Sequence, residues 1–174
     1  MATAGKNLSE YNKGETPDAS TMRFGIIVSE WNHHITSRLL EGAKNCLLEN
    51  GCLEENVLIE SVPGAFELPL GAQFILESKE VDGVICIGSV IEGETKHFDF
   101  VCEGATMGIK DVALKYNKPV IFCVLTDQTE QQAKDRSGGK HGNKGTEAAI
   151  AAINMAALKN RLSPKRKTAG YTKD

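Results

Sequence analysis

The stretch Cys86-Ile87-Gly88-Ser89-Val90-Ile91-Glu92-Gly93-Glu94-Thr95-Lys96-His97-Phe98-Asp99 decides the fold. An apolar run of strand character ends in a glycine turn, and a histidine then stands where a helix begins. In open α/β sheets the carboxyl ends of the strands bind ligands, and the first turn of the following helix offers unpaired N–H groups and the positive end of its dipole. We therefore expect His97 to lie beside an anion-binding helix end, and chemistry on a phosphorylated substrate is the first hypothesis.

Strand-and-helix units of the same kind occur on both sides of this stretch. Residues 24–28 form a short apolar run, and apolar residues then recur at helical spacing until Gly51. The other units are predicted at 57–62 before 65–78, at 81–91 before 98–116, and at 120–125 before two later helices. Four such units predict an α/β fold with a four-stranded parallel sheet as its core, covered on both faces by helices in a flavodoxin-like, three-layer αβα sandwich.

Residues 22–162 are predicted to form a single domain, because 174 residues suffice for one well-buried core but not for two. The last part of this domain reads as a short helix at 130–136, a loop at 137–143 and a long alanine-rich helix at 144–162. Residues 1–21 are polar, and we expect a flexible or partner-dependent N-terminal arm. Residues 163–174 form a polar, basic tail, for which a solvated end is favoured over a nucleic-acid-binding arm.

The composition argues against several classes of partner. Lys and Arg number 20 against 23 for Asp and Glu, so the net charge of −3 gives no reason to expect nucleic acid or a membrane surface as partner. No segment approaches the length of an apolar membrane span and the N-terminus lacks the pattern of an export signal, which predicts a soluble, cytoplasmic protein. The five cysteines are an odd number without CxxC spacing, which fits reduced thiols better than a metal site.

Polar and aromatic residues follow the predicted strands and should meet at one edge of the sheet. Trp31, the only tryptophan, can stack on a heterocycle or cover the edge of the core, and the pattern alone does not choose between the two. Asn32 can bond to a polyhydroxylated ligand or cap a helix. Glu67 can bind hydroxyl groups or complement a helix dipole. Thr126 and Asp127 follow the last strand and reach the same edge.

Three further side chains are charged or titrate near neutral pH. A neutral imidazole at His97 can accept a proton, although most lone histidines are structural or solvated. Arg136 can hold a phosphate group or complement the carboxyl end of its own helix. Lys144 begins a helix, where a cation is electrostatically disfavoured, and its presence at that position indicates a functional role. The remaining histidines show no third metal ligand, so no metal site is predicted.

The motifs Trp31-Asn32, Gly64-Ala65-Phe66-Glu67, Gly88 through Asp99, and Asn143-Lys144-Gly145 occur in a fixed order. In that order the chain resembles the 6,7-dimethyl-8-ribityllumazine synthase family over roughly residues 23–160. The resemblance implies the penultimate step of riboflavin biosynthesis, in which 5-amino-6-(D-ribitylamino)uracil condenses with 3,4-dihydroxy-2-butanone 4-phosphate to give 6,7-dimethyl-8-ribityllumazine, phosphate and water. It implies a transferase that uses no metal and no organic cofactor.

The resemblance also implies roles for particular residues. His97 would be the catalytic proton-transfer group, and Trp31 would stack on the pyrimidine. Arg136 would hold the phosphate group together with the backbone around Glu94 and Thr95. The other implied substrate contacts are Asn32, Ala65 and Glu67 at the ribityl chain, Phe66 beside them, Val90 and Ile91 as pocket-lining backbone, and Phe122 and Lys144 from the adjacent subunit.

Members of the family assemble as pentamers, and some pack twelve pentamers into an icosahedral shell. The resemblance therefore implies a homopentamer, and the short segment at 138–143 favours the shell, which can enclose riboflavin synthase. Glu92 departs from the family, whose members often carry a non-acidic residue there. Because a carboxylate inside a phosphate pocket would repel the anion, we expect Glu92 to face away from the ligand.

Three rival functions stay open from the residues: a non-catalytic α/β ligand-binding or signalling module, a shell protein that encloses cargo with vestigial catalysis, and an archaeal-type riboflavin synthase. The joint presence of His97, Arg136 and Glu67 argues against the first. Supplying both substrates and following the lumazine product separates all three.

Overall fold

The computed structural model describes residues 7–163, and its centre is a four-stranded parallel sheet with the strand order β2-β1-β3-β4. The strands are β1 (Phe24–Ser29), β2 (Val57–Val62), β3 (Gly83–Ile91) and β4 (Val120–Asp127). Each strand lies within the range that the sequence predicts, give or take two residues. The predicted α/β fold with a four-stranded parallel core is therefore confirmed.

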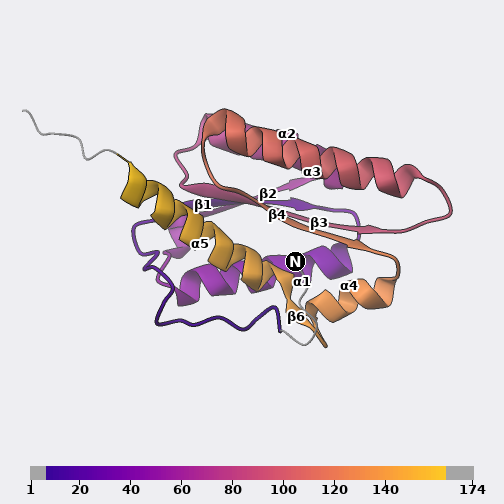
Figure 1. Ribbon diagram of the computed structural model, residues 1–174, viewed down its shortest axis with the longest axis horizontal. Coiled ribbons are helices and arrows are strands. Elements are labelled where there is room, and N and C mark those ends of the chain that lie inside the picture. The colour runs from indigo at the N-terminus through magenta and orange to yellow at the C-terminus, as the bar shows by residue number, and fades with distance from the viewer. Residues whose placement is uncertain (1–6, 164–174) are drawn as a thin grey trace, which may run out of the picture.

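Helices cover both faces of this sheet (Figure 1). One face carries α2 (Leu68–Ser78) and α3 (His97–Tyr116), and the other carries α1 (His33–Glu49), α4 (Glu130–Arg136) and α5 (Lys144–Leu162). Two short 3-10 turns, η1 (Glu54–Asn56) and η2 (Ala65–Glu67), flank β2. Within residues 7–163, no helix combines the length and the apolar character that crossing a bilayer requires.

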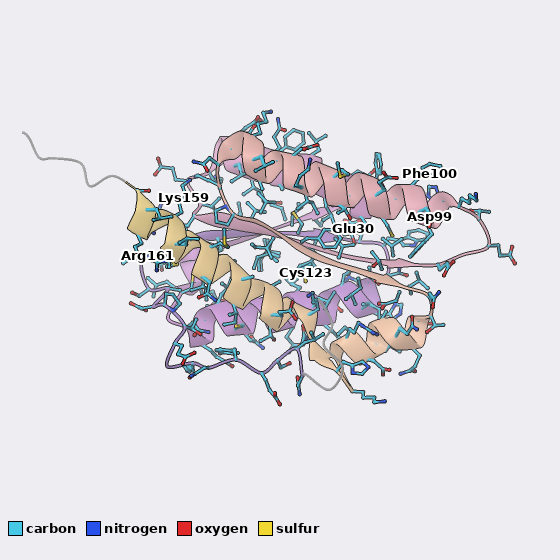
Figure 2. All side chains as sticks on the ribbon, viewed as in Figure 1. Glu30, Asp99, Phe100, Cys123, Lys159 and Arg161 are labelled. Carbon is cyan, nitrogen blue, oxygen red and sulfur yellow. The ribbon has the colours of Figure 1, made fainter. Side chains whose placement is uncertain are left out.

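The apolar side chains of the strands alternate between two cores, because successive residues of a strand point to opposite faces. Ile26 and Cys123 belong to the core beneath α1 and α5, whereas Ile27 and Cys86 belong to the core beneath α2 and α3. Figure 2 shows Cys123 on the α1 and α5 side of the sheet. Seven consecutive residues of β3, from Gly83 to Ser89, are buried, so the strand reads as a continuous apolar run.

The segment between α4 and α5 is a small antiparallel hairpin, whereas the sequence predicts a loop there. Its strands are β5 (Ser137–Gly139) and β6 (Gly142–Asn143). Gly138 and Gly142 have φ angles of 108° and 82°, a region that favours glycine, and this lets the chain reverse within a few residues. Strands of three and two residues are too short to leave a periodic pattern in the sequence.

Residues 7–22 lie along the α1 and α5 side of the domain. The backbone N–H of Leu8 donates to the carbonyl of His141 at 2.8 Å, and the hydroxyl of Ser9 accepts from the N–H of Asn143 at 2.9 Å. Ala19 and Met22 are buried in the core. The first six residues of the predicted arm and residues 164–174 of the predicted tail lie outside the described residues.

Replacing Gly145 with alanine should lower the free energy of unfolding by about 2–3 kcal/mol. Gly145 lies in the first turn of α5, and a Cβ atom there would stand 1.9 Å from the carbonyl oxygen of Leu39 in α1. Because that oxygen belongs to backbone, the two helices must move apart. Chemical denaturation measures the loss. The matched control is Gly93→Ala, where a Cβ atom would meet nothing within 4 Å, and equal stability of the two variants would contradict the packing argument.

Candidate functional site

A hollow of about 730 Å³ lies at the carboxyl ends of β1 and β3. It is bounded by the segments that follow β1, β2 and β3 and by the first turns of α3. Most of the side chains singled out from the sequence line this hollow, namely Trp31, Asn32, Ala65, Phe66, Glu67, Val90, Ile91, Thr95 and His97. The parallel topology thus brings together residues that stand far apart in the chain.

Trp31 and Asn32 form the turn between β1 and α1. The Trp31 side chain is 74% exposed, so its ring does not cover the core and is free to stack on a ligand. Asn32 has a left-handed backbone with φ 58°, and its amide donates to the carbonyl oxygen of Ser89 at 2.9 Å. The Asn32 side chain therefore ties α1 to β3 and does not cap α1.

The segment after β2 supplies the opposite wall. Pro63 and Gly64 lead into η2, where Ala65 is buried while Phe66 and Glu67 are exposed toward solvent. The N–H of Glu67 donates to the carbonyl of Gly64 at 3.3 Å, which closes the tight turn. The Glu67 side chain does not cap α2, so its carboxylate is free to accept hydrogen bonds from a ligand.

His97 is the first residue of α3, and its imidazole is exposed at the hollow. The hydroxyl of Thr95 accepts from the backbone N–H of His97 at 3.4 Å. Asp99 and Phe100 stand beside it at the same end of α3 (Figure 2). The site therefore combines a titratable base with the positive end of a helix of 20 residues.

Glu92 and Glu94 lie in the exposed loop that precedes α3. Neither side chain lines the hollow, although Gly93 and Thr95 between and beside them do. The backbone N–H of Glu92 donates to the carbonyl of Asp127 at 2.9 Å, which extends the pairing of β3 with β4. That the Glu92 carboxylate points away from a bound ligand stays a prediction.

A second hollow, of about 390 Å³, lies at the carboxyl end of β4 and holds the two cations singled out from the sequence. Arg136, the last residue of α4, donates from Nη1 to the carbonyl of Gln132 at 3.0 Å. Lys144, the first residue of α5, pairs with Glu147. Neither cation lines the hollow of His97 within this chain.

Asp127 lines the same hollow as these two cations, and the sequence assigns it no role. Its side chain is 8% exposed, and its Oδ1 lies 3.6 Å from Nη1 of Arg136. Burial raises the pKa of the Asp127 carboxyl, and the nearby guanidinium of Arg136 opposes that rise only in part. The one signal in the sequence is the place of Asp127 at the end of a predicted strand.

Phe122 lies in the middle of β4 and is half-buried against the core beneath α2 and α3. It lines neither hollow within this chain.

Among residues 7–163, no cluster of three or more His, Cys, Asp or Glu side chains has a metal-binding arrangement. The arrangement thus offers a base, a stacking ring, hydroxyl-binding groups and a separate pair of cations.

Fold and site together define an α/β protein whose carboxyl edge can bind a heterocycle and move protons next to an anion-binding region. The family model described as 6,7-dimethyl-8-ribityllumazine synthase matches residues 21–160. The chain belongs to this family.

Curated relatives of the same name cover nearly the whole chain. The protein of Flavobacterium psychrophilum is 57% identical over 163 residues, which are 94% of this chain and 86% of the relative. That of Christiangramia forsetii is 56% identical over 160 residues, or 91% and 95% of the two chains. That of Cytophaga hutchinsonii is 56% identical over 157 residues, or 90% and 98%. The resemblance predicted from the motifs is confirmed.

Proposed function

We propose that this protein catalyses the condensation of 5-amino-6-(D-ribitylamino)uracil with 3,4-dihydroxy-2-butanone 4-phosphate to 6,7-dimethyl-8-ribityllumazine, with release of phosphate and water. This reaction is the penultimate step of riboflavin biosynthesis, and the protein is a transferase. The observation that carries the proposal is the match of residues 21–160 to the family, on a chain whose hollow gathers the motif residues around His97. Neither residues 7–163 nor the related proteins favour a non-catalytic role.

The reaction needs proton transfer and anion binding at neighbouring places. The aromatic amine of the uracil attacks the ketone, and water leaves as the imine forms. Phosphate leaves from the four-carbon unit, and the ribityl-bearing amine closes the ring with loss of a second water. Each step moves protons between nitrogen, oxygen and carbon, which the imidazole of a histidine can do without a cofactor.

The residues at the His97 hollow suit the uracil substrate. We assign proton transfer to His97 and stacking on the pyrimidine to Trp31, whose ring is exposed. Asn32, Ala65 and Glu67 suit the ribityl chain, since they offer an amide, close backbone and a carboxylate to its hydroxyl groups. Phe66, Val90 and Ile91 complete the lining.

The phosphate group is assigned to Arg136 and to the backbone around Glu94 and Thr95. Arg136 and Lys144 line a hollow separate from that of His97, and Phe122 lines neither. A complete site would therefore need Arg136, Lys144 and Phe122 of a neighbouring subunit to reach the His97 hollow. We infer that the active site forms between two copies of the chain.

An apolar surface supports assembly. It consists of exposed side chains on η2, α2 and α3, namely Phe66, Leu70, Phe74, Phe100, Met107 and Leu114. Their exposed fractions run from 49% to 73%, and such a surface on a monomer marks a contact face. We assign it to a cytoplasmic homopentamer. The compact hairpin of β5 and β6 further suits an icosahedral shell of pentamers, which can enclose riboflavin synthase.

Leu114→Asp should dissociate the assembly into smaller particles and abolish most lumazine formation. Leu114 is 73% exposed at the end of α3. A carboxylate that becomes buried there on assembly, without a hydrogen-bond partner, would cost about 2–7 kcal/mol. Analytical ultracentrifugation measures the particle size. The matched control is Leu162→Asp, since Leu162 is 72% exposed at the end of α5 and lies outside this surface. An unchanged size for Leu114→Asp would refute the assigned contact face.

The two-substrate assay tests the function. The purified protein is given both substrates, and the absorbance and fluorescence of the lumazine are followed together with the release of inorganic phosphate. Equal amounts of lumazine and phosphate are expected. A binding module or a non-catalytic shell would form neither, and an archaeal-type riboflavin synthase would instead consume added lumazine and form riboflavin.

A further inference from the structure

A buried carboxylate lies behind the cation that we assign to the phosphate group. The side chain of Asp127 is 8% exposed, that of Arg136 is 31% exposed, and Oδ1 of the first lies 3.6 Å from Nη1 of the second. The other carboxylate oxygen, Oδ2, is inaccessible and has no hydrogen-bond partner among the described residues. Both residues line the same hollow, so the open side of Arg136 faces the space that a ligand can enter.

Both anchors of Nη1 belong to rigid elements. Asp127 is the last residue of β4 and pairs with Ile91 of β3, and its carbonyl accepts from the N–H of Glu92 at 2.9 Å. The second anchor is the carbonyl of Gln132, which lies 3.0 Å from Nη1. Gln132 is fixed in turn, because its side chain and that of Thr129 form a capping box at the start of α4.

We propose that Asp127 is a positioning residue, which holds the Nη1 side of the Arg136 guanidinium against the sheet edge and leaves its remaining N–H groups for the phosphate group of the substrate. The inference rests on the proposed function, because it gives Arg136 a phosphoryl ligand. An arginine side chain has several rotatable bonds, and fixing one edge of its planar fork lowers the entropy lost when the other edge binds an anion.

The charge of this carboxylate is not expected to stabilise the fold. Burial raises the pKa of Asp127 above its ordinary value, so the folded protein favours the protonated form more than the unfolded chain does. The contribution of this group to stability is therefore largest at acidic pH and is lost as the pH rises through the folded-state pKa. At neutral pH, Asp127→Asn should leave the melting temperature equal or higher, whereas a purely structural role predicts a lower one.

Kinetics of Asp127→Asn and Asp127→Ala test the positioning role. In both variants we expect the KM for the phosphorylated ketone to rise about tenfold, which corresponds to the loss of one partly buried charge pair. The inhibition constant of inorganic phosphate should rise by the same factor. The KM for the aminouracil should stay within about twofold. The matched control is Glu130→Gln, which removes an exposed carboxylate of α4 that pairs with Lys134 and lies outside the hollow.

A double-mutant cycle shows whether Asp127 acts through Arg136. In an Arg136→Gln background, Asp127→Asn should have no further effect on the inhibition constant of phosphate. An equal effect in both backgrounds overturns the inference. Tighter phosphate binding by Asp127→Asn overturns it as well, because Asp127 would then act only as an opposing charge.

Calorimetry with inorganic phosphate alone separates this inference from the proposed function. Weaker phosphate binding by Asp127→Asn supports the positioning role even if the wild-type protein forms no lumazine, which would reject the proposed function alone. Normal lumazine formation with unchanged phosphate binding in Asp127→Asn rejects the positioning role alone. A wild-type protein that binds no inorganic phosphate would also rule out the positioning role of Asp127.

Discussion

His97→Ala should lower kcat by about 10²–10⁴-fold while the assembly keeps its size, because the variant loses the group that we assign to proton transfer but no packed side chain. The His97 imidazole is exposed at the start of α3, so its removal leaves the core intact. Lumazine formation is measured with both substrates at saturation. Sedimentation of the same sample reports the assembly, and the KM values show whether binding has changed.

His33→Ala is the matched control for this variant. His33 also begins a helix at the carboxyl edge of the sheet and is exposed, but it does not line the hollow. We expect its kcat to stay within about twofold of the wild type, as for a surface substitution away from the site. Equal rates for the two variants and the wild type would remove His97 from the mechanism.

The sheet could be predicted because a strand that is buried on both faces is apolar along nearly its whole length. The apolar run at 24–28 and the run ending at Ile91 are strand-length and nearly uninterrupted, as expected of strands covered by helices on both sides. The helix after the first run shows apolar residues at helical spacing until Gly51. With four such units in succession, the right-handedness of the crossover connections leaves only a few possible strand orders for the sheet.

The separation of the site into two hollows could not be predicted from topology alone. The rule that ligands bind at the carboxyl edge places Trp31 and His97 at the same edge, but it does not place Arg136, which ends a helix, and it says nothing about distances along that edge. The structure puts the first two at the ends of β1 and β3 and the third at the end of β4. Within residues 7–163, neither of the two hollows is lined by all three side chains.

The roles of Phe122 and Asp127 depend on alternation within β4. Phe122 packs on the α2 and α3 side, whereas its neighbour Cys123 packs on the α1 and α5 side. Asp127 points to the side of Cys123 and meets Arg136 only because α4 returns the chain to that face. A buried aspartate at a strand end has no sequence pattern of its own, so its partner could not be predicted.

Arg136→Ala should lower kcat/KM for the phosphorylated ketone by about 10²–10³-fold, since the variant loses the charged donor assigned to the departing phosphate. The KM for the aminouracil should change little, because Arg136 does not line the hollow that holds the residues we assign to the pyrimidine. Initial rates with each substrate varied in turn measure the two effects.

The matched control for Arg136 is Lys134→Ala, which removes a cation from the same helix that pairs with Glu130 and lies outside the hollow. A general loss of positive charge would weaken the use of the phosphorylated ketone in both variants, whereas a specific contact weakens it in Arg136→Ala alone. The expected loss exceeds the tenfold effect of Asp127→Asn, because a positioning residue changes how the guanidinium is held while alanine removes it. Equal losses in Arg136→Ala and Lys134→Ala would show that the phosphate group binds elsewhere.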